Sequence, residues 1–284
     1  MLQSMIQGLV NGLSMGWVYI LMALGLSLIF GIMRIIQFAH GEIYMMGAYL
    51  AYFLTLCHVP LFIATLVSMV AMGFAGFLLQ TVFFRRFQEQ AHLSIIFGLG
   101  LMLILQTSAV LSFGLVARTL PPLCQYSIEL LGIKIPGDRL VAAFFSIILV
   151  TVCYLFLKKT KYGLAIVACA ENRQGAELQG ISHARMSIIV MSMGCALAAA
   201  GGTIAGSLLQ LSPFMGAEAM VKGLIIIIFG GMGSLFGTIL GGLVLGLIDG
   251  IVPILFGSAA TALFPLIFVI FVLIIRPQGL FGHE

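Results

Sequence analysis

Long apolar segments separated by short polar connections run through the whole chain and constrain its fold more than any other feature. Several of them reach or exceed the roughly 20 residues that an α-helix needs to cross a bilayer, and the first 33 residues carry no charged side chain. Charged residues make up only 8% of the sequence, and the mean hydropathy is +1.21. The alternating segments of about ten residues that build a membrane β-barrel are not seen. The sequence therefore predicts an all-α, polytopic transmembrane helical bundle.

The apolar segments predict eight or nine helices in one transmembrane domain, residues 1–284. Residues 34–47 and 223–229 are too short or too interrupted to cross upright, so broken or half-helices are expected there. Between Arg118 and Arg139, two proline-containing pairs predict an external cap or a short hairpin instead of a helix. Continuous spans are expected at residues 5–33, 60–84, 93–116, 141–157, 186–211, 236–253 and 259–275.

The segment 158–185 is the longest polar stretch, and it orients the chain in the membrane. It holds five of the thirteen Lys and Arg residues. Lys158, Lys159 and Lys161 directly follow an apolar segment, as basic residues do at the cytoplasmic end of a membrane helix. With this loop in the cytoplasm, nine of the thirteen basic residues lie on the cytoplasmic side. We therefore expect an outside N-terminus and a cytoplasmic C-terminus.

Small and polar residues inside this loop predict one short helix from Ala165 to Leu178. Gly180 is placed to end that helix in a left-handed conformation, and Ser182 is placed to cap the next one. A helix this short is marginally stable in water. It either lies in the groove of a partner protein or belongs to a solvated hairpin that joins two membrane helices.

Polar residues inside apolar sequence mark a candidate path for a solute, because such residues usually line a cavity or pair with one another at membrane depth. Glycine-interrupted segments occur at residues 31–47 and 230–241, as expected where two related halves meet at a substrate path. The alternatives are a plain interfacial turn and glycine-rich helices that are alike only in composition. The candidate path residues are Arg34, Gln37, His40, Gly41, Glu42, Gly47, Gly230, Gly231, Gly233 and Ser234.

Glycines repeat at four-residue spacing in the next-to-last apolar segment. The steps 237/241, 242/246 and 246/250 leave one face of this helix without side chains. Such a face belongs in a tightly packed helix interface rather than against lipid. Asp249 lies in the same segment and is expected to face a partner group or water. The expected packing residues are Gly237, Gly241, Gly242 and Gly246.

Motifs of enzymes and metal sites are missing from the sequence. It has no G-x-x-x-x-G-K-[ST] stretch, so the chain cannot bind ATP through a P-loop of its own. The five Cys and five His residues show no metal-binding spacing. An intramembrane hydrolase using His40 and Glu42 is disfavoured, because side chains two residues apart diverge on a helix. We expect no catalytic residue, metal, bound cofactor or nucleic-acid partner.

Four stretches of the sequence together resemble one transporter family. In the order in which they occur, they resemble the shorter permease type of bacterial ABC importers for branched-chain amino acids, the high-affinity Leu/Ile/Val transport family. They span most of the chain, and their combination is specific although each piece alone is mostly glycine and aliphatic residues. The stretches are GWVYILMALGLSLIFGIMRIIQFAHGEIYMMGAYLA, ACAENRQGAELQGI, FGGMGSLFGTILGGLVLG and RPQGLFG.

The resemblance implies a transport subunit of the inner membrane that works by alternating access and is not an enzyme. It implies ABC ATPase subunits that hold ATP and Mg, a second permease subunit in a homo- or heterodimer, and an extracytoplasmic solute-binding protein. Residues 163–181 resemble the segment that docks on the ATPase, although the common Glu-Ala-Ala order is replaced by Ala170-Glu171-Asn172. The implied coupling residues are Ala170, Glu171, Asn172, Arg173, Ala176, Glu177, Gly180 and Ile181.

Other transport functions fit parts of the same sequence. A related ABC permease for urea, short amides or another small solute would look alike, because the binding protein sets most of the specificity. A stand-alone channel or secondary transporter would need intramembrane charges for ion coupling. The chain offers few of these beyond Glu218, Lys222 and Asp249.

Overall fold

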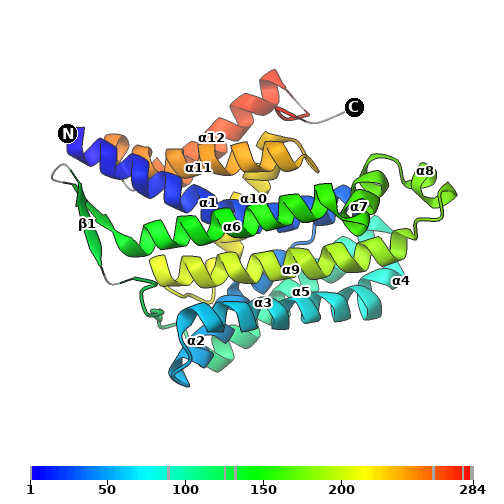
Figure 1. Cartoon of the computed structure of the whole chain (residues 1–284), viewed down its shortest axis with the longest axis horizontal. Coiled ribbons are helices and arrows are strands. Elements are labelled where there is room, and N and C mark those ends of the chain that lie inside the picture. The colour runs from blue at the N-terminus through cyan, green and yellow to red at the C-terminus, as the bar shows by residue number, and fades with distance from the viewer. Residues whose placement is uncertain are drawn as a thin grey trace.

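Nine helices of 16 or more residues build the part of the chain that the computed structural model describes, which comprises residues 2–87, 90–124, 126–130, 133–257, 260–276 and 278–281. Figure 1 shows several of them side by side along the long axis of the molecule. The predicted all-α bundle is confirmed. The long helices are α1 Leu2–Met33, α2 His40–Leu56, α3 Leu61–Leu78, α5 Ala91–Phe113, α6 Gly137–Lys159, α9 His183–Leu208, α10 Met215–Gly230, α11 Leu235–Phe256 and α12 Ala260–Ile275.

Shorter elements lie at the two ends of the bundle. An antiparallel β-hairpin stands at the end where α1 begins, and α4, α7 and α8 stand at the opposite end (Figure 1). The hairpin confirms the interruption predicted between Arg118 and Arg139. A π-helical turn joins α3 to α4. These elements are η1 Leu79–Phe84, α4 Arg85–Phe87, β1 Ser127–Leu130, β2 Ile133–Pro136, α7 Lys161–Glu171 and α8 Arg173–Leu178.

Six helical segments of the described chain are long and apolar enough to cross a membrane, namely residues 3–33, 61–87, 92–113, 137–159, 183–208 and 235–256. α10 is longer than the apolar piece expected at residues 223–229, because it begins at Met215 and includes Glu218 and Lys222. That prediction was wrong because it took the charged residues as the end of the helix. In the structure, Lys222 is paired with Asp249 and lies within α10.

One pattern of helices and linkers occurs twice in the chain. The linkers of α1, α2 and α3 are residues 34–39 and 57–60, and those of α9, α10 and α11 are residues 209–214 and 231–234. Both copies therefore have a linker of six residues followed by one of four. α1 contacts α11 while α9 contacts α3, so the first helix of each copy packs on the third helix of the other.

The two copies run in opposite directions. Near its middle, α1 meets α9 at Leu21 and Gly201, whereas further along α1 the contact is between Ile29 and Gly194. A later residue of α1 thus meets an earlier residue of α9, so the two helices are antiparallel. Figure 1 shows the same relation, since α1 starts at the hairpin end and α9 starts near α8. The repeat is therefore inverted.

Reciprocal glycine contacts mark the centre of this repeat. α2 crosses α10 where each has its second residue, Gly41 and Gly216, and a Cβ on either glycine would overlap the carbonyl oxygen of the other. Counting from these positions, residues 34–47 correspond to 209–222. The sequence-based pairing of residues 31–47 with 230–241 was therefore wrong, because glycine content alone does not set the register of a repeat.

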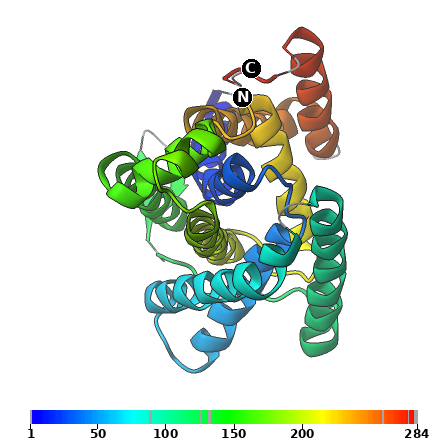
Figure 2. The same cartoon turned by 90° about the vertical axis from the view of Figure 1, so that its right-hand side faces the viewer.

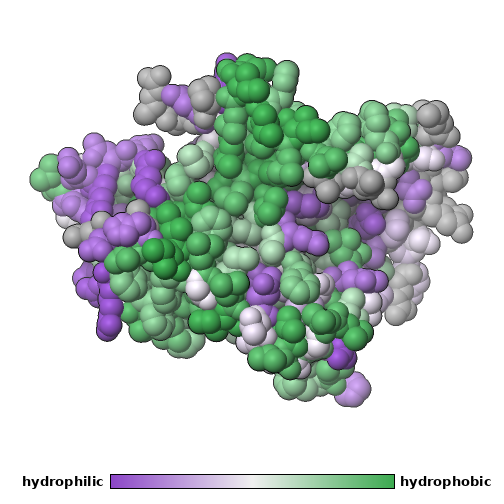
Figure 3. All heavy atoms as spheres, turned by 180° about the vertical axis from the view of Figure 1, so that it is seen from behind, coloured by the Kyte–Doolittle hydropathy of each residue, from purple (hydrophilic) through white to green (hydrophobic). Residues whose placement is uncertain are grey.

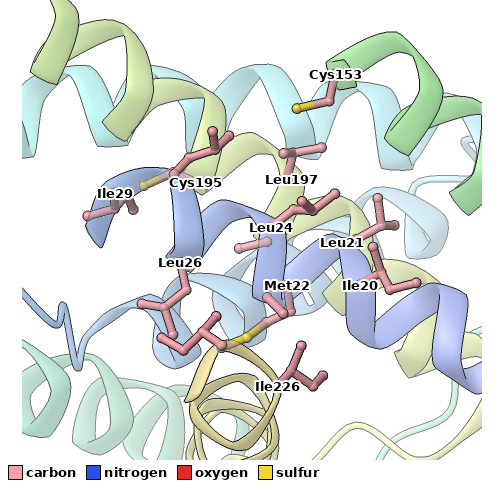
Figure 4. Close-up of a cluster of buried hydrophobic side chains, with 14 of the residues drawn as sticks. Ile20, Leu21, Met22, Leu24, Leu26, Ile29, Cys153, Cys195, Leu197 and Ile226 are labelled. Atoms are coloured by element: carbon pink, nitrogen blue, oxygen red, sulfur yellow. The ribbon is translucent and has the colours of Figure 1, made fainter. Parts of the chain in front are cut away.

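α1 and α9 form the centre of the bundle. Both are buried along most of their apolar length, whereas α3, α5, α6 and α11 expose most of theirs. Figure 2, which looks along the bundle, shows other helices around α1 and places α5 and α12 at one side. Met22 and Leu26 of α1 pack on α10 at Gly223, and Figure 4 shows both side chains on the α10 side of α1. Close packing of this kind is what holds membrane helices together.

Candidate functional site

The loop between α6 and α9 holds two helices instead of the one predicted from Ala165 to Leu178. Asn172 separates α7 from α8. Its backbone is extended (φ −147°), and its side-chain oxygen accepts a hydrogen bond of 2.8 Å from the backbone N–H of Gly175. The prediction was wrong because an Asn side chain competes with the preceding helix for backbone N–H groups and so caps a new one.

Gly180 ends α8 in the predicted left-handed conformation, with a φ of +81°. The backbone N–H of Ile181 donates a hydrogen bond of 3.0 Å to the carbonyl oxygen of Ala176, which closes the helix end as a glycine cap does. Ser182 occupies the N-cap position of α9, but its side chain makes no capping hydrogen bond.

α7 is anchored to the bundle by one face. Gly163, Ile166 and Cys169 are buried on that face, and α7 contacts α1, α6 and α9. Burial, and secondly the Glu177 carboxylate, raises the pKa of the Cys169 thiol. The Cys169 thiol is therefore protonated at neutral pH. The buried face and the contacts of α7 make this helix part of the bundle surface rather than a free loop.

α8 carries most of the exposed residues of the predicted coupling set. Arg173 and Glu177 form an ion pair of 3.1 Å on its surface, and such exposed pairs contribute little to stability. Leu178 is 89% exposed, the highest value among the large apolar residues that the structure describes. The sequence reasoning did not select Leu178, although an apolar side chain among polar neighbours could have indicated it. In the predicted set, Glu171, Asn172, Arg173, Glu177 and Gly180 are exposed, Ala170 and Ile181 are partly buried, and Ala176 is buried.

Arg34 connects this loop to the first linker of the repeat. Its guanidinium donates a hydrogen bond of 2.9 Å to the carbonyl oxygen of Ala170, in the last turn of α7. Gly31 lies 3.8 Å from Ala170 and from Gly233 of the α10–α11 linker, measured from the position of an added Cβ. The end of α7 therefore contacts the first copy at a junction where Gly31 also meets the second copy; the junction is formed by Gly31, Arg34, Ala170 and Gly233.

The other early path residues are packed inside the protein instead of lining an opening. Gln37, His40 and Glu42 are at most 1% exposed, and their side-chain polar atoms have no hydrogen-bond partner in the described part of the chain. Gly41 faces Gly216, and Gly47 lies against Ala199 of α9. Buried polar groups of this kind are costly, so these residues are of interest for function but form no open path in this conformation.

The late path residues form the tight turn between α10 and α11. Gly231 and Gly233 have positive φ angles of 98° and 86°, which glycine adopts at little cost. Ser234 caps α11 by accepting a hydrogen bond of 3.1 Å from the backbone N–H of Gly237. Gly230 and Gly237 pack directly on each other across the turn. The turn is therefore a rigid corner beside the α7 junction.

The glycine face of α11 packs on α1. Gly242 and Gly246 lie against Gly16, and Gly246 also lies against Gly12. Gly241 packs on Ile226 of α10 instead. The glycines of the two helices thus meet each other, so the backbones of α1 and α11 approach closely, and the Ile20 side chain lies against Gly242.

Tyr19, Lys222 and Asp249 form a charged cluster within the spans, here called the Lys222 cluster. The Lys222 ammonium donates hydrogen bonds of 2.7 Å to the Tyr19 hydroxyl and 2.5 Å to Asp249 Oδ2. The Tyr19 hydroxyl donates one of 2.8 Å to the same carboxylate oxygen. Asp249 therefore faces partner groups, as the sequence led us to expect. Tyr19 was missed, because a tyrosine in an apolar helix gives no sign of a partner 230 residues away.

These features describe a multi-pass membrane protein with an internal inverted repeat and a helical loop fixed to both copies of it. Residues 8–275 match the family described as the branched-chain amino acid transport system permease component. The chain belongs to this family of ABC permeases, and the resemblance stated from the sequence is confirmed.

Individual relatives agree with the family. The chain is 30% identical to the high-affinity branched-chain amino acid transport system permease protein BraD of Pseudomonas aeruginosa, over 98% of this chain and 96% of that protein. It is 28% identical to the corresponding LivH protein of Escherichia coli, with the same coverage. The fructose import permease protein FrcC of Rhizobium meliloti is similar over 35% of this chain. No solved structure matches the chain.

Proposed function

We propose that this chain is the membrane-spanning subunit of an ATP-driven importer that moves branched-chain or other hydrophobic amino acids across the inner membrane. The names of the relatives BraD and LivH support this solute class. Partner ATPase subunits hold ATP and Mg, a second permease completes the path, and an extracytoplasmic binding protein delivers the solute. This chain itself binds no nucleotide.

The observation that carries the proposal is the junction at the end of α7. Arg34 and Gly31 of the first copy of the repeat lie at Ala170, and Gly31 in turn contacts Gly233 of the second copy. A force applied to α8 by closing ATPase subunits would pass through α7 to the first linker and, through Gly31, to the second. Because each linker joins two helices of one copy that pack on helices of the other copy, its displacement would open the bundle on one side and close it on the other, as alternating access requires.

The proposal also fixes the orientation of the chain. It places α7, α8 and the C-terminus in the cytoplasm and the β-hairpin outside. A membrane-impermeant maleimide applied to intact spheroplasts should label a cysteine at Tyr126, which is 83% exposed, but not one at Leu178. The reverse pattern would refute this orientation.

Co-purification tests the coupling role. We expect an ATPase subunit to accompany the detergent-solubilised wild-type chain and to be lost from Glu171→Arg/Leu178→Arg, which changes exposed residues only. Tyr126→Arg, at the opposite end, is the matched control and should retain the ATPase. If no ATPase accompanies the wild type, or if solute uptake continues without one, the chain works alone and the importer proposal fails.

Uptake by the reconstituted importer identifies the solute class. Excess unlabelled leucine, isoleucine or valine should abolish the uptake of labelled leucine, whereas urea and short amides should not compete. Strong competition by urea or an amide would instead support the related permease for small polar solutes.

A further inference from the structure

We infer that the Lys222 cluster and Glu218 form a binding site for the charged head group of an apolar α-amino acid, with Lys222 taking the carboxylate and Glu218 the ammonium. This inference rests on the proposed function and adds the residues that would contact the solute.

The hydrogen bonds of Lys222 leave one of its donors unused. A lysine ammonium has three N–H groups, and Tyr19 and Asp249 accept two of them. The third has no acceptor in the described part of the chain. The Lys222 side chain is 31% exposed, whereas that of Asp249 is only 8% exposed. Asp249 and Tyr19 therefore occupy two of the three donors of the ammonium, and one donor remains for a solute.

Glu218 lies one helical turn before Lys222 on the same face of α10. It is exposed, and it forms no ion pair in the described part of the chain. Ionisable groups at membrane depth face a protein partner or water rather than lipid. α10 lies behind α1 in Figure 1 and hence on the side seen in Figure 3, where hydrophilic residues also appear within the hydrophobic surface and not only at its ends. This face of α10 is therefore suited to the solute path between two permeases.

The charges of a zwitterionic solute fit this arrangement. A bound amino acid would complete a row of alternating sign from Asp249 through Lys222, the solute carboxylate and the solute ammonium to Glu218. Phe214 and Val221, each 48% exposed, flank the two charged residues and offer apolar surface to a branched side chain. A small uncharged solute such as urea would offer Glu218 no countercharge and the free donor of Lys222 no carboxylate, which is less favourable.

Leucine import and ATP hydrolysis by the whole reconstituted importer test the inference together. Lys222→Met should lower leucine import by about tenfold or more, the usual effect of losing a hydrogen bond to a charged group. ATP hydrolysis stimulated by the loaded binding protein should stay within about twofold of wild type, because the coupling loop is unchanged. Glu218→Gln should act in the same way, and Lys222→Arg should recover part of the import. Lys159→Met, which removes an exposed lysine at the end of α6, is the matched control and should import normally.

The outcomes separate this inference from the proposed function. If the wild type imports no leucine, the proposed function fails. If the wild type imports leucine and Lys222→Met matches it, the head-group site is wrong while the function stands. If Lys222→Met loses the second permease on purification, or loses import and ATP hydrolysis in equal measure, Lys222 serves assembly or folding and the inference is overturned.

Protection from labelling tests solute contact directly. Val221→Cys places a thiol beside Lys222, and millimolar leucine should slow its alkylation in the purified importer. The same protection should disappear when Lys222→Met is added, and 3-methylbutylamine, which lacks the carboxylate, should not protect the thiol. Equal protection with and without Lys222 would contradict the site.

Discussion

α2 and α10 hold equivalent positions in the two copies of the repeat, yet they present different chemistry to their surroundings. At the eighth residue, α2 has Gly47, packed against Ala199 of α9, whereas α10 has the partly exposed Lys222. The acidic residue in the first turn is Glu42 in α2, which is buried, and Glu218 in α10, which is exposed. The same scaffold thus occurs twice, and of the two helices α10 exposes charged side chains whereas α2 buries its one carboxylate.

This difference indicates that the two copies of the repeat have different roles. The glycines of the first copy allow α2 to lie close to α9 and α10, which makes that half a packing element. The second copy exposes a less closely packed helix face that bears a paired lysine and a glutamate that forms no ion pair within the described residues. Substitutions at the packing glycines of the first copy should therefore lower stability, whereas substitutions at the charged residues of the second copy should lower solute import.

The largest effect is expected from Gly41→Ala at the centre of the repeat. A Cβ at Gly41 would overlap the carbonyl oxygen of Gly216, so α2 and α10 would have to separate at a cost of about 3 kcal/mol or more. Thermal unfolding in detergent measures this change. Gly100→Ala on α5, where an added Cβ meets nothing within 4 Å, is the control with the same gain in helix propensity. Equal stability of the two variants would show that α2 and α10 do not pack as described.

The next effect is expected from Asp249→Leu in the second copy. This change leaves the Lys222 ammonium without its countercharge, which costs about 3 kcal/mol for a buried pair, and somewhat less here because Lys222 is 31% exposed. The double variant Lys222→Met/Asp249→Leu removes both charges and should recover most of the unfolding temperature. A double variant as unstable as the single one would mean that Asp249 stabilises the fold by contacts other than Lys222. Import should stay low in both variants.

Sequence reasoning predicted the features that depend on neighbouring residues. The lengths of the apolar segments predicted the bundle, and the prolines between Arg118 and Arg139 predicted the interruption. Gly180 predicted the end of a helix. The break at Asn172 was missed although it is local, because the same residue can either continue a helix or cap a new one. Local chemistry therefore predicts where elements occur more reliably than where one element divides.

The features that sequence reasoning missed depend on residues far apart in the chain. The partners Tyr19 and Asp249 are 230 residues apart, and no local pattern connects them. The register of the repeat likewise depends on the contact between Gly41 and Gly216, whereas glycine content alone suggested residues 230–241. Arg34 was selected for its charge, but its partner is a backbone carbonyl, which has no sequence signature. These contacts arise only when the two copies pack together.

A smaller effect is expected at the junction that joins the two copies to the loop. Arg34→Asn removes the hydrogen bond to Ala170, while Asn tolerates the left-handed backbone of this position (φ 54°). Losing one partly solvated hydrogen bond should lower leucine import per ATP hydrolysed by about fivefold. His58→Asn is the matched control, because His58 also has a positive φ (62°) and lies in the second linker of the same copy. An unchanged ratio in Arg34→Asn would remove Arg34 from the coupling route.

The smallest effect is expected from Asn172→Ala, which tests whether α8 must be a separate capped helix. The substitution removes the hydrogen bond from Gly175 N and should cost about 1 kcal/mol of local stability. Amide hydrogens of α8 should then exchange about fivefold faster, while those of α7, capped by Thr160, stay unchanged. Gln174→Ala, at an exposed position in α8, controls for loss of a polar side chain. Faster exchange together with weaker ATPase recovery would show that the partner binds a preformed α8. Faster exchange with normal ATPase recovery would show that binding of the ATPase orders α8. The contact between the loop and the repeat would then depend on α7 alone.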